Sequence, residues 1–145
     1  MVMTDPFDLE RFTMAQEAVY ERVRAELSAG RKRTHWMWYV FPQVTGLGRS
    51  STSALYAIRS EEEARAYLEH PILGARLREC TNLVLAVEGK SALDILGSPD
   101  DVKFQSSMTL FASIVEPESI FSQALDRYFG GERDVRTVEF LKGSA

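Results

Sequence analysis

An unusually aromatic segment, His-Trp-Met-Trp-Tyr-Val-Phe-Pro-Gln, runs from His35 to Gln43. Trp36 and Trp38 offer large flat rings, and the stacking of a nucleobase on such a ring contributes about 1–3 kcal/mol. The Gln43 amide can read the edge of a base, or it can satisfy the backbone of a loop. The segment is therefore a candidate wall for a flat ligand, with His35, Trp36 and Gln43 at its edge.

The plainer interpretation of this segment is a hub of the hydrophobic core, and we favour it. Both faces of the segment are apolar, so it is buried in either conformation, and its indole N–H groups and the Tyr39 hydroxyl need partners. No second strand signal accompanies it, and a lone strand would leave backbone groups unpaired. We expect a short buried helix, with an extended segment as the alternative.

The flanks of the segment carry groups that suit a phosphate. Basic residues occupy positions 31–33, and residues 46–51 combine two glycines, Arg49 and two serines ahead of an expected helix. Glycines, hydroxyls and a helix N-terminus together suit anion binding. The plainer interpretations are a solvated basic patch beside the end of the first helix and a turn followed by an N-cap.

Polar residues on two expected helices are further candidates. Lys103, Ser106 and Ser107 share one helical face beside an apolar stripe, and Asp101 either belongs to their site or forms a capping box with Ser98. Gln16 lies on the core stripe of the first helix. A buried amide needs hydrogen bonds, so it either bonds a neighbouring backbone or lines a pocket.

The totals exclude several classes of function. The 145 residues are 45% hydrophobic and 26% charged, with a net charge of −4, which argues against general nucleic-acid binding. The two histidines are far apart, so we expect no metal site, and nothing indicates a cofactor. Cys80 is expected to be a buried, inert thiol. No signal peptide or membrane span is expected, and we predict a cytoplasmic protein.

Helix signals dominate the chain and predict an all-α fold, a single domain over residues 1–145 with about seven to eight helices around the aromatic segment. Apolar spacing, caps and helix breakers predict helices over residues 5–30, 71–89, 91–97, 98–117 and 118–130. Two further helices are predicted to begin at residues 60 and 134.

Three motifs together resemble the bacterial family catalogued as domain of unknown function 1810. They are Asp-Pro-Phe-Asp-Leu at 5–9, the aromatic segment, and the stretch from Gly97 to Phe111, so the resemblance covers nearly the whole chain. It implies a mostly helical single domain and no particular activity. The label calpastatin, sometimes attached to this family, has no support in these residues.

A more distant resemblance is to the NADAR proteins, which remove ADP-ribose from modified bases. Glu10, followed by Ala-Gln at 15–16, is similar to their helical Glu…Ala-Gln motif, and the run Leu96-Gly97, Asp101, Lys103, Ser106 looks like a second motif. The resemblance implies that Glu10 is an acid/base or orienting carboxylate, and that Asp101 and Lys103 hold the ribose or a phosphate. A carboxylate can stabilise the cationic transition state of N-glycosidic cleavage.

Two hypotheses follow. In the first, the chain binds a nucleotide or ADP-ribose-like ligand, a small phosphorylated molecule, and is an N-glycosidase-type hydrolase or a degenerate one. This hypothesis requires Glu10, the tryptophans and Lys103 to line one pocket. In the second, the chain is a non-catalytic protein-interaction module, which predicts no concave polar pocket and an exposed apolar patch.

Overall fold

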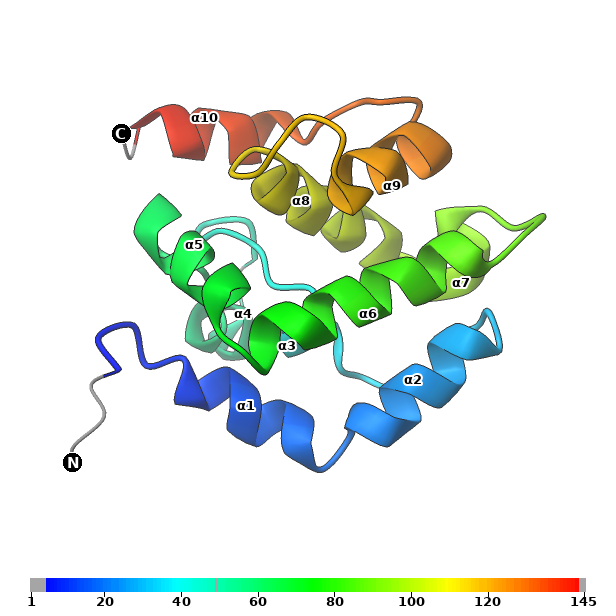
Figure 1. Cartoon of the computed structure of the whole chain (residues 1–145), viewed down its shortest axis with the longest axis horizontal. Coiled ribbons are helices and arrows are strands. Elements are labelled where there is room, and N and C mark those ends of the chain that lie inside the picture. Colours follow the sequence, from blue (N-terminus) through cyan, green and yellow to red (C-terminus); the bar gives the residue numbers. More distant parts are fainter. Residues whose placement is uncertain (1–4, 49, 144–145) are drawn as a thin grey trace.

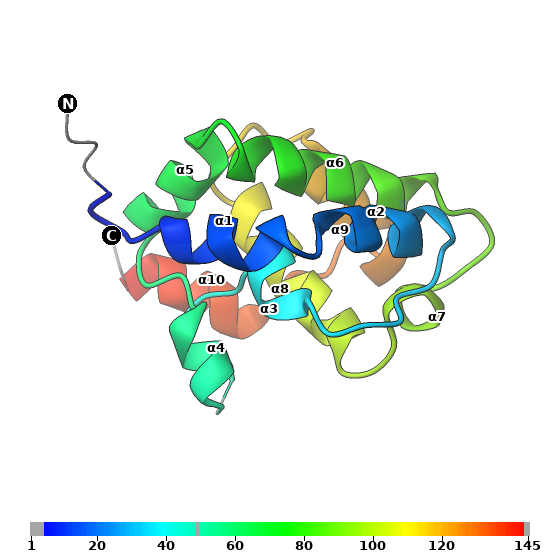
Figure 2. The same cartoon turned by 90° about the horizontal axis from the view of Figure 1, so that it is seen from below.

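Helix α6 (Leu73–Ala86) crosses the middle of the molecule (Figure 1). Below it in that view lie α1 (Glu10–Glu17) and α2 (Tyr20–Ser28), and above it lie α8 (Asp100–Ala112), α9 (Ile120–Phe129) and α10 (Val135–Gly143). The view from below agrees, because α1 and α2 lie in front of the other helices there and α4 (Ser51–Leu55) projects from one side (Figure 2). The computed structural model describes residues 5–48 and 50–143.

The described residues form ten helices and no strand, which confirms the all-α prediction with a somewhat higher helix count. Besides α1, α2 and α6, they are α3 (Met37–Val40), α4 (Ser51–Leu55), α5 (Glu61–Glu69), α7 (Ala92–Leu96), α8 (Asp100–Ala112), α9 (Ile120–Phe129) and α10 (Val135–Gly143). None of the helices in this part of the chain is long and apolar enough to cross a membrane.

The single helix expected over residues 5–30 is two helices in the structure. The first of them begins at Glu10 and not near residue 5. Its N-cap is Leu9 without a side-chain cap, and the Asp5 carboxylate accepts hydrogen bonds from the backbone N–H groups of Leu9 and Glu10. The break at Ala18 and Val19 has a physical reason in packing. The first half packs against α3, whereas the second half packs against α6.

Several of the other helix ends follow their local signals, but α8 ends at Ala112, whereas a helix to residue 117 was expected. Ser91 and Asp94 form the capping box of α7, and Asp134 caps α10 by accepting from the backbone of Thr137. Ser98 does not cap α8, whose N-terminus has no side-chain cap, so the expected capping box of Ser98 with Asp101 is absent there.

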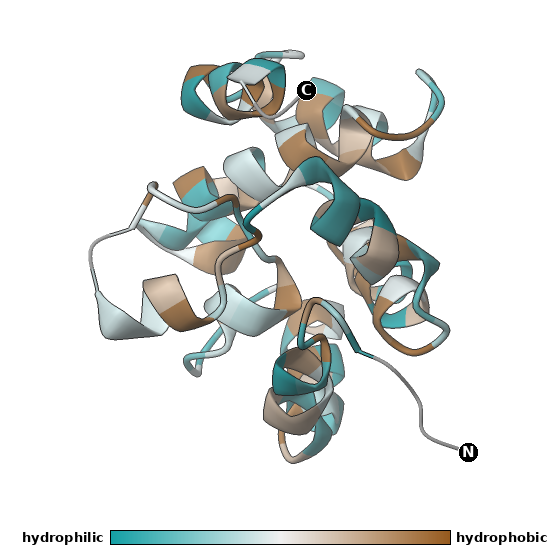
Figure 3. Cartoon of the chain, turned by 90° about the vertical axis from the view of Figure 1, so that its left-hand side faces the viewer, coloured by the Kyte–Doolittle hydropathy of each residue, from teal (hydrophilic) through white to brown (hydrophobic). Residues whose placement is uncertain are grey.

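The core is continuous and combines aliphatic side chains with a set of buried aromatic rings. Rings of Phe41 and Phe104 meet edge to face with centroids 5.0 Å apart, and Phe12 meets Tyr67 in the same way at 5.0 Å. Edge-to-face pairs are a preferred geometry for aromatic rings. Helix α8 is buried on nearly every side from Ser106 to Ala112. Most of the other helices are amphipathic, with hydrophobic and hydrophilic residues on the same ribbon (Figure 3).

Helices α5 and α6 approach each other closely at Gly74. A Cβ atom on this residue would lie 2.0 Å from the carbonyl oxygen of Leu68, which belongs to the backbone and cannot move aside alone. Gly74 is therefore required for the turn between these two helices.

Candidate functional site

The aromatic segment is a short helix followed by an extended strand-like stretch, so each of the two expected conformations describes part of it. Helix α3 covers Met37–Val40, and the chain then runs extended to an isolated parallel bridge between Val44 and Ile58. The Gln43 carbonyl oxygen accepts a hydrogen bond from the Ile58 backbone at 2.8 Å. This pairing satisfies backbone groups that a lone strand would leave unpaired.

Trp36 belongs to the core. Its side chain is 1% exposed, and its indole N–H donates to Glu26 at 2.9 Å. The same carboxylate accepts hydrogen bonds from the backbone N–H groups of Arg33 and Thr34 and from the Thr34 hydroxyl. Burial acts to raise the pKa of Glu26, but these hydrogen bonds outweigh it and lower the pKa to about 2. The hydrogen bonds of Glu26 to Trp36 and to the preceding residues thus fix the chain segment that leads into α3.

Trp38, two positions later, points to a different environment and is half-buried. It lines a cavity of about 370 Å³, here called the Trp38 cavity. Four predicted ligand-binding residues meet there, namely Trp38, Gln43, Lys103 and Ser106. The remaining lining residues are Leu47, Gly48, Pro99, Val102, Asp134 and Arg136. The cavity is formed by α3, the loop after it, α8 and the start of α10.

Cations dominate the charge of the Trp38 cavity. The Lys103 ammonium lies 3.9 Å from the centroid of the Trp38 ring and 3.3 Å from an oxygen of Asp100. Arg136 lies across the cavity wall and donates to the Gly46 carbonyl oxygen at 2.6 Å. Asp134 is the carboxylate among the lining residues, and it is engaged in capping α10. The described lining therefore offers two cations that an anion can approach.

Gln43 supplies an unused donor. The residue is 8% exposed, and its side-chain nitrogen is buried without a hydrogen-bond partner among the described residues. A buried donor without a partner costs about 1–3 kcal/mol. Ser106, which is also buried, uses its hydroxyl to donate to the Val102 carbonyl oxygen at 3.2 Å, and that oxygen atom can still accept from a ligand.

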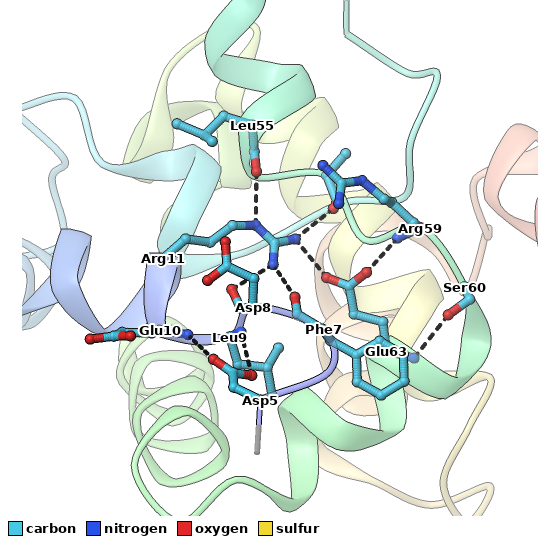
Figure 4. Close-up of polar contacts among 11 residues, drawn as sticks. Asp5, Phe7, Asp8, Leu9, Glu10, Arg11, Leu55, Arg59, Ser60 and Glu63 are labelled. Carbon is cyan, nitrogen blue, oxygen red and sulfur yellow. Dashed lines mark hydrogen bonds and ion pairs between the residues drawn. The ribbon is translucent and has the colours of Figure 1, made fainter. Parts of the chain in front are cut away.

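Glu10 lies elsewhere. It is exposed at the start of α1 and lines a separate cavity of about 560 Å³ with Phe7, His70 and Ile72 among others. Figure 4 shows its carboxylate pointing away from the neighbouring polar cluster. The structure does not bring Glu10 into the lining of the Trp38 cavity, so the arrangement that the first hypothesis required is absent for this residue.

That polar cluster, centred on Arg11 and Glu63, carries a buried ion pair that the sequence analysis missed. The two side chains are 7% and 3% exposed and meet at 2.6 Å. The Arg11 guanidinium also donates to the carbonyl oxygens of Leu55 and Ala57, at 2.8 and 2.9 Å (Figure 4). Arg11 therefore anchors the segment after α4 to α1. Its place between Glu10 and Phe12 contained no signal for this role, because the partners that Arg11 holds across the fold, Leu55, Ala57 and Glu63, are 44 to 52 residues away in the chain.

The other predicted site residues lie outside the lining of the Trp38 cavity. Gln16 is buried, and its amide bonds the Tyr39 carbonyl oxygen at 2.6 Å, as in the interpretation that it satisfies a neighbouring backbone. His35 is exposed, and Arg49 lies outside the described residues. Asp101 and Ser107 each have a buried side-chain oxygen without a partner among the described residues, but they do not reach this cavity.

Asp134 and Arg136 are charged lining residues that the sequence analysis did not single out. Asp134 stands at the start of the last expected helix, and Arg136 lies in the first turn of α10, where nothing in the sequence marks it as facing α3.

Comparisons with known proteins give a family and a structural relative. The sequence model of the family described as "Protein of unknown function (DUF1810)" matches residues 6–141. The crystal structure of the conserved hypothetical protein Rv1873 from Mycobacterium tuberculosis is similar, with a TM-score of 0.93 and 55% identity over 95% of this chain and 99% of that chain. No curated protein matches. Neither match is to a NADAR protein, so that resemblance stays a prediction.

Proposed function

The chain belongs to the DUF1810 family of proteins of unknown function, and from the geometry of its Trp38 cavity we propose that it binds a small phosphorylated molecule there. The observation that carries this proposal is the meeting of Lys103, Arg136 and Gln43 in one cavity, where the Gln43 amide nitrogen has no partner among the described residues. A guanidinium and an ammonium are the side chains that hold phosphate oxygens, and a buried donor selects the position of an acceptor.

The cavity favours ligand binding over the interaction-module hypothesis, which predicts no concave polar pocket. It does not favour the N-glycosidase mechanism through Glu10, because that carboxylate lines another cavity. The proposal is therefore binding of a nucleotide or ADP-ribose-like molecule, and no catalytic step is assigned to Glu10 or Asp101.

A thermal-shift and calorimetry screen of the full chain tests this proposal, with inorganic phosphate, pyrophosphate, nucleotides, ADP-ribose and NAD as probes. A probe present at 100 times its dissociation constant adds about 2.7 kcal/mol to the free energy of unfolding. We expect Lys103→Ala to weaken binding at least tenfold, and Lys142→Ala, which removes an exposed lysine of α10, to leave it unchanged. Absence of binding by every phosphorylated probe would overturn the proposal.

A further inference from the structure

A second cavity adjoins the Trp38 cavity and has no charged residue among its described lining. It has a volume of about 220 Å³ and is here called the neutral cavity. The two cavities share Trp38, Gln43 and Gly48. The rest of the neutral cavity is lined by Val44, Thr45, Gly46, Ser53, Ala54, Tyr56 and Ala57. Its wall of small, aromatic and hydroxyl side chains suits a flat uncharged group.

The wall between the cavities is tightly packed. A Cβ atom on Gly48 would lie 2.5 Å from the Ser53 Cβ atom and 3.2 Å from the Trp38 ring, so Gly48 fits between them only because it has no side chain. The far wall is held from α1, since Ala57 is fixed through its carbonyl oxygen by the Arg11 guanidinium. These contacts indicate a built cavity with fixed walls.

Lys103 determines which side of Trp38 a ring can use. Its ammonium, 3.9 Å from the ring centroid, occupies one face of the indole. The cation–π contact and the Asp100 carboxylate both hold it there. A ligand ring therefore has the neutral cavity open to it, whereas an anionic group belongs on the side of Lys103 and Arg136.

Gln43 joins the two cavities because it lines both, and its buried side-chain N–H group has no partner among the described residues. Such a donor pairs with a carbonyl oxygen or a ring nitrogen. The neutral cavity alone is below the roughly 300–1,000 Å³ that is usual for a ligand site, and the two together fall within that range.

We propose that the two cavities are halves of one site, and that its ligand has two parts. A neutral flat ring with a hydrogen-bond acceptor occupies the neutral cavity and accepts from Gln43, and a phosphate lies beside Lys103 and Arg136. A nucleoside monophosphate has this chemistry. The inference rests on the proposed function and deepens it by naming the ligand class.

Calorimetry on the full chain tests whether the site has a ring half and a phosphate half. The four main probes are AMP, ribose 5-phosphate, adenosine and inorganic phosphate, and UMP and GMP extend the test to other bases. We expect at least one nucleoside monophosphate to bind at least tenfold more tightly than ribose 5-phosphate. Ala57→Leu, which fills the neutral cavity, removes this advantage and leaves the affinity for ribose 5-phosphate within twofold. Gln43→Leu, which removes the donor to the ring, also removes this advantage, and it serves as the second variant where Ala57→Leu fails to fold. Lys103→Ala weakens every phosphorylated probe.

Two outcomes would overturn the inference while leaving the proposed function in place. One is equal affinity for every nucleoside monophosphate and ribose 5-phosphate in the wild type. The other is unchanged nucleotide affinity in the variants at Ala57 and Gln43. Failure of every phosphorylated probe to bind overturns the proposed function and this inference together.

Discussion

The ammonium group of Lys103 lies 3.9 Å from the centroid of the Trp38 ring, and it shares the carboxylate of Asp100 with a second lysine. That second lysine, Lys32, is 2.7 Å from the other Asp100 oxygen, and its ammonium lies 5.0 Å from the centroid of Trp36. Trp38 in α3 and Trp36 at its N-cap thus each form a cation–π contact with a lysine, and the Asp100 carboxylate forms an ion pair with both lysines. This network holds Lys103 at the cavity wall before any ligand arrives.

Replacing the shared carboxylate should destabilise the fold. In Asp100→Asn both lysines lose their anion, and the Lys32 side chain is only 6% exposed. Removal of one partner of a buried ion pair costs about 3–5 kcal/mol, and the partly exposed Lys103 places the expected loss near the lower value, about 3 kcal/mol. Urea unfolding measures it, with Asp126→Asn on the surface of α9 as the control. A loss below about 1 kcal/mol would show that the Asp100 carboxylate does not hold the two lysines in place.

The two buried glutamines should respond oppositely to the same substitution. Gln43→Leu removes an amide nitrogen that has no partner among the described residues, so the free energy of unfolding without ligand should stay the same or rise by about 1 kcal/mol. Gln16→Leu removes an amide that bonds Tyr39, Tyr67 and Arg76, so it should lower the free energy of unfolding by about 1–3 kcal/mol. Thermal and urea unfolding of both variants make the comparison. Equal destabilisation would mean that the Gln43 amide is already satisfied in the absence of ligand.

The carboxylate of Glu26 should make stability depend on pH below about 5. Its pKa in the folded protein is lowered to about 2, against an ordinary value of 4.5, because four hydrogen bonds favour the charged form. A group with a lowered folded pKa contributes stability above its unfolded pKa, and this contribution is lost as the pH falls through the folded pKa.

The wild type should therefore exceed Glu26→Gln in free energy of unfolding at pH 6, and the difference should shrink by about 2–3 kcal/mol as the pH falls from 5 to 2. Urea unfolding over this pH range provides the measurement, and Glu62→Gln, an exposed position on α5, is the control. A difference that is constant with pH would contradict the lowered pKa.

Two ion pairs in this chain differ in burial and should differ in strength. Arg11→Met leaves the Glu63 carboxylate buried without its cation and frees the carbonyl oxygens of Leu55 and Ala57, so we expect a loss of about 3–5 kcal/mol. Arg24→Met breaks exposed ion pairs, which solvent screens, and should lower the free energy of unfolding far less. Urea unfolding of Arg11→Met and Arg24→Met compares the two losses through their midpoints, provided that both variants have the same denaturant m-value. Similar losses would show that Arg11 does not anchor the segment after α4.

Much of the secondary structure could be predicted because its causes lie within a few residues. Ser91 bonds Asp94 and Asp134 bonds Thr137, so these helix ends depend on neighbours three positions away. The burial of the aromatic segment likewise follows from its composition, whichever conformation it adopts. The split of the first helix could not be predicted in the same way, because α1 and α2 pack on different partners.

The sequence alone determined the helical class, most helix ends and the set of chemical groups available, because caps and apolar periodicity act over one or two turns. Only the tertiary structure decided which groups meet. It placed Trp36 in the core and Trp38 in a cavity wall, brought Gln43, Lys103 and Arg136 together, and left Glu10 on another surface. The reason is that these residues come from elements tens of residues apart, and the packing of whole helices around the aromatic core sets their distances.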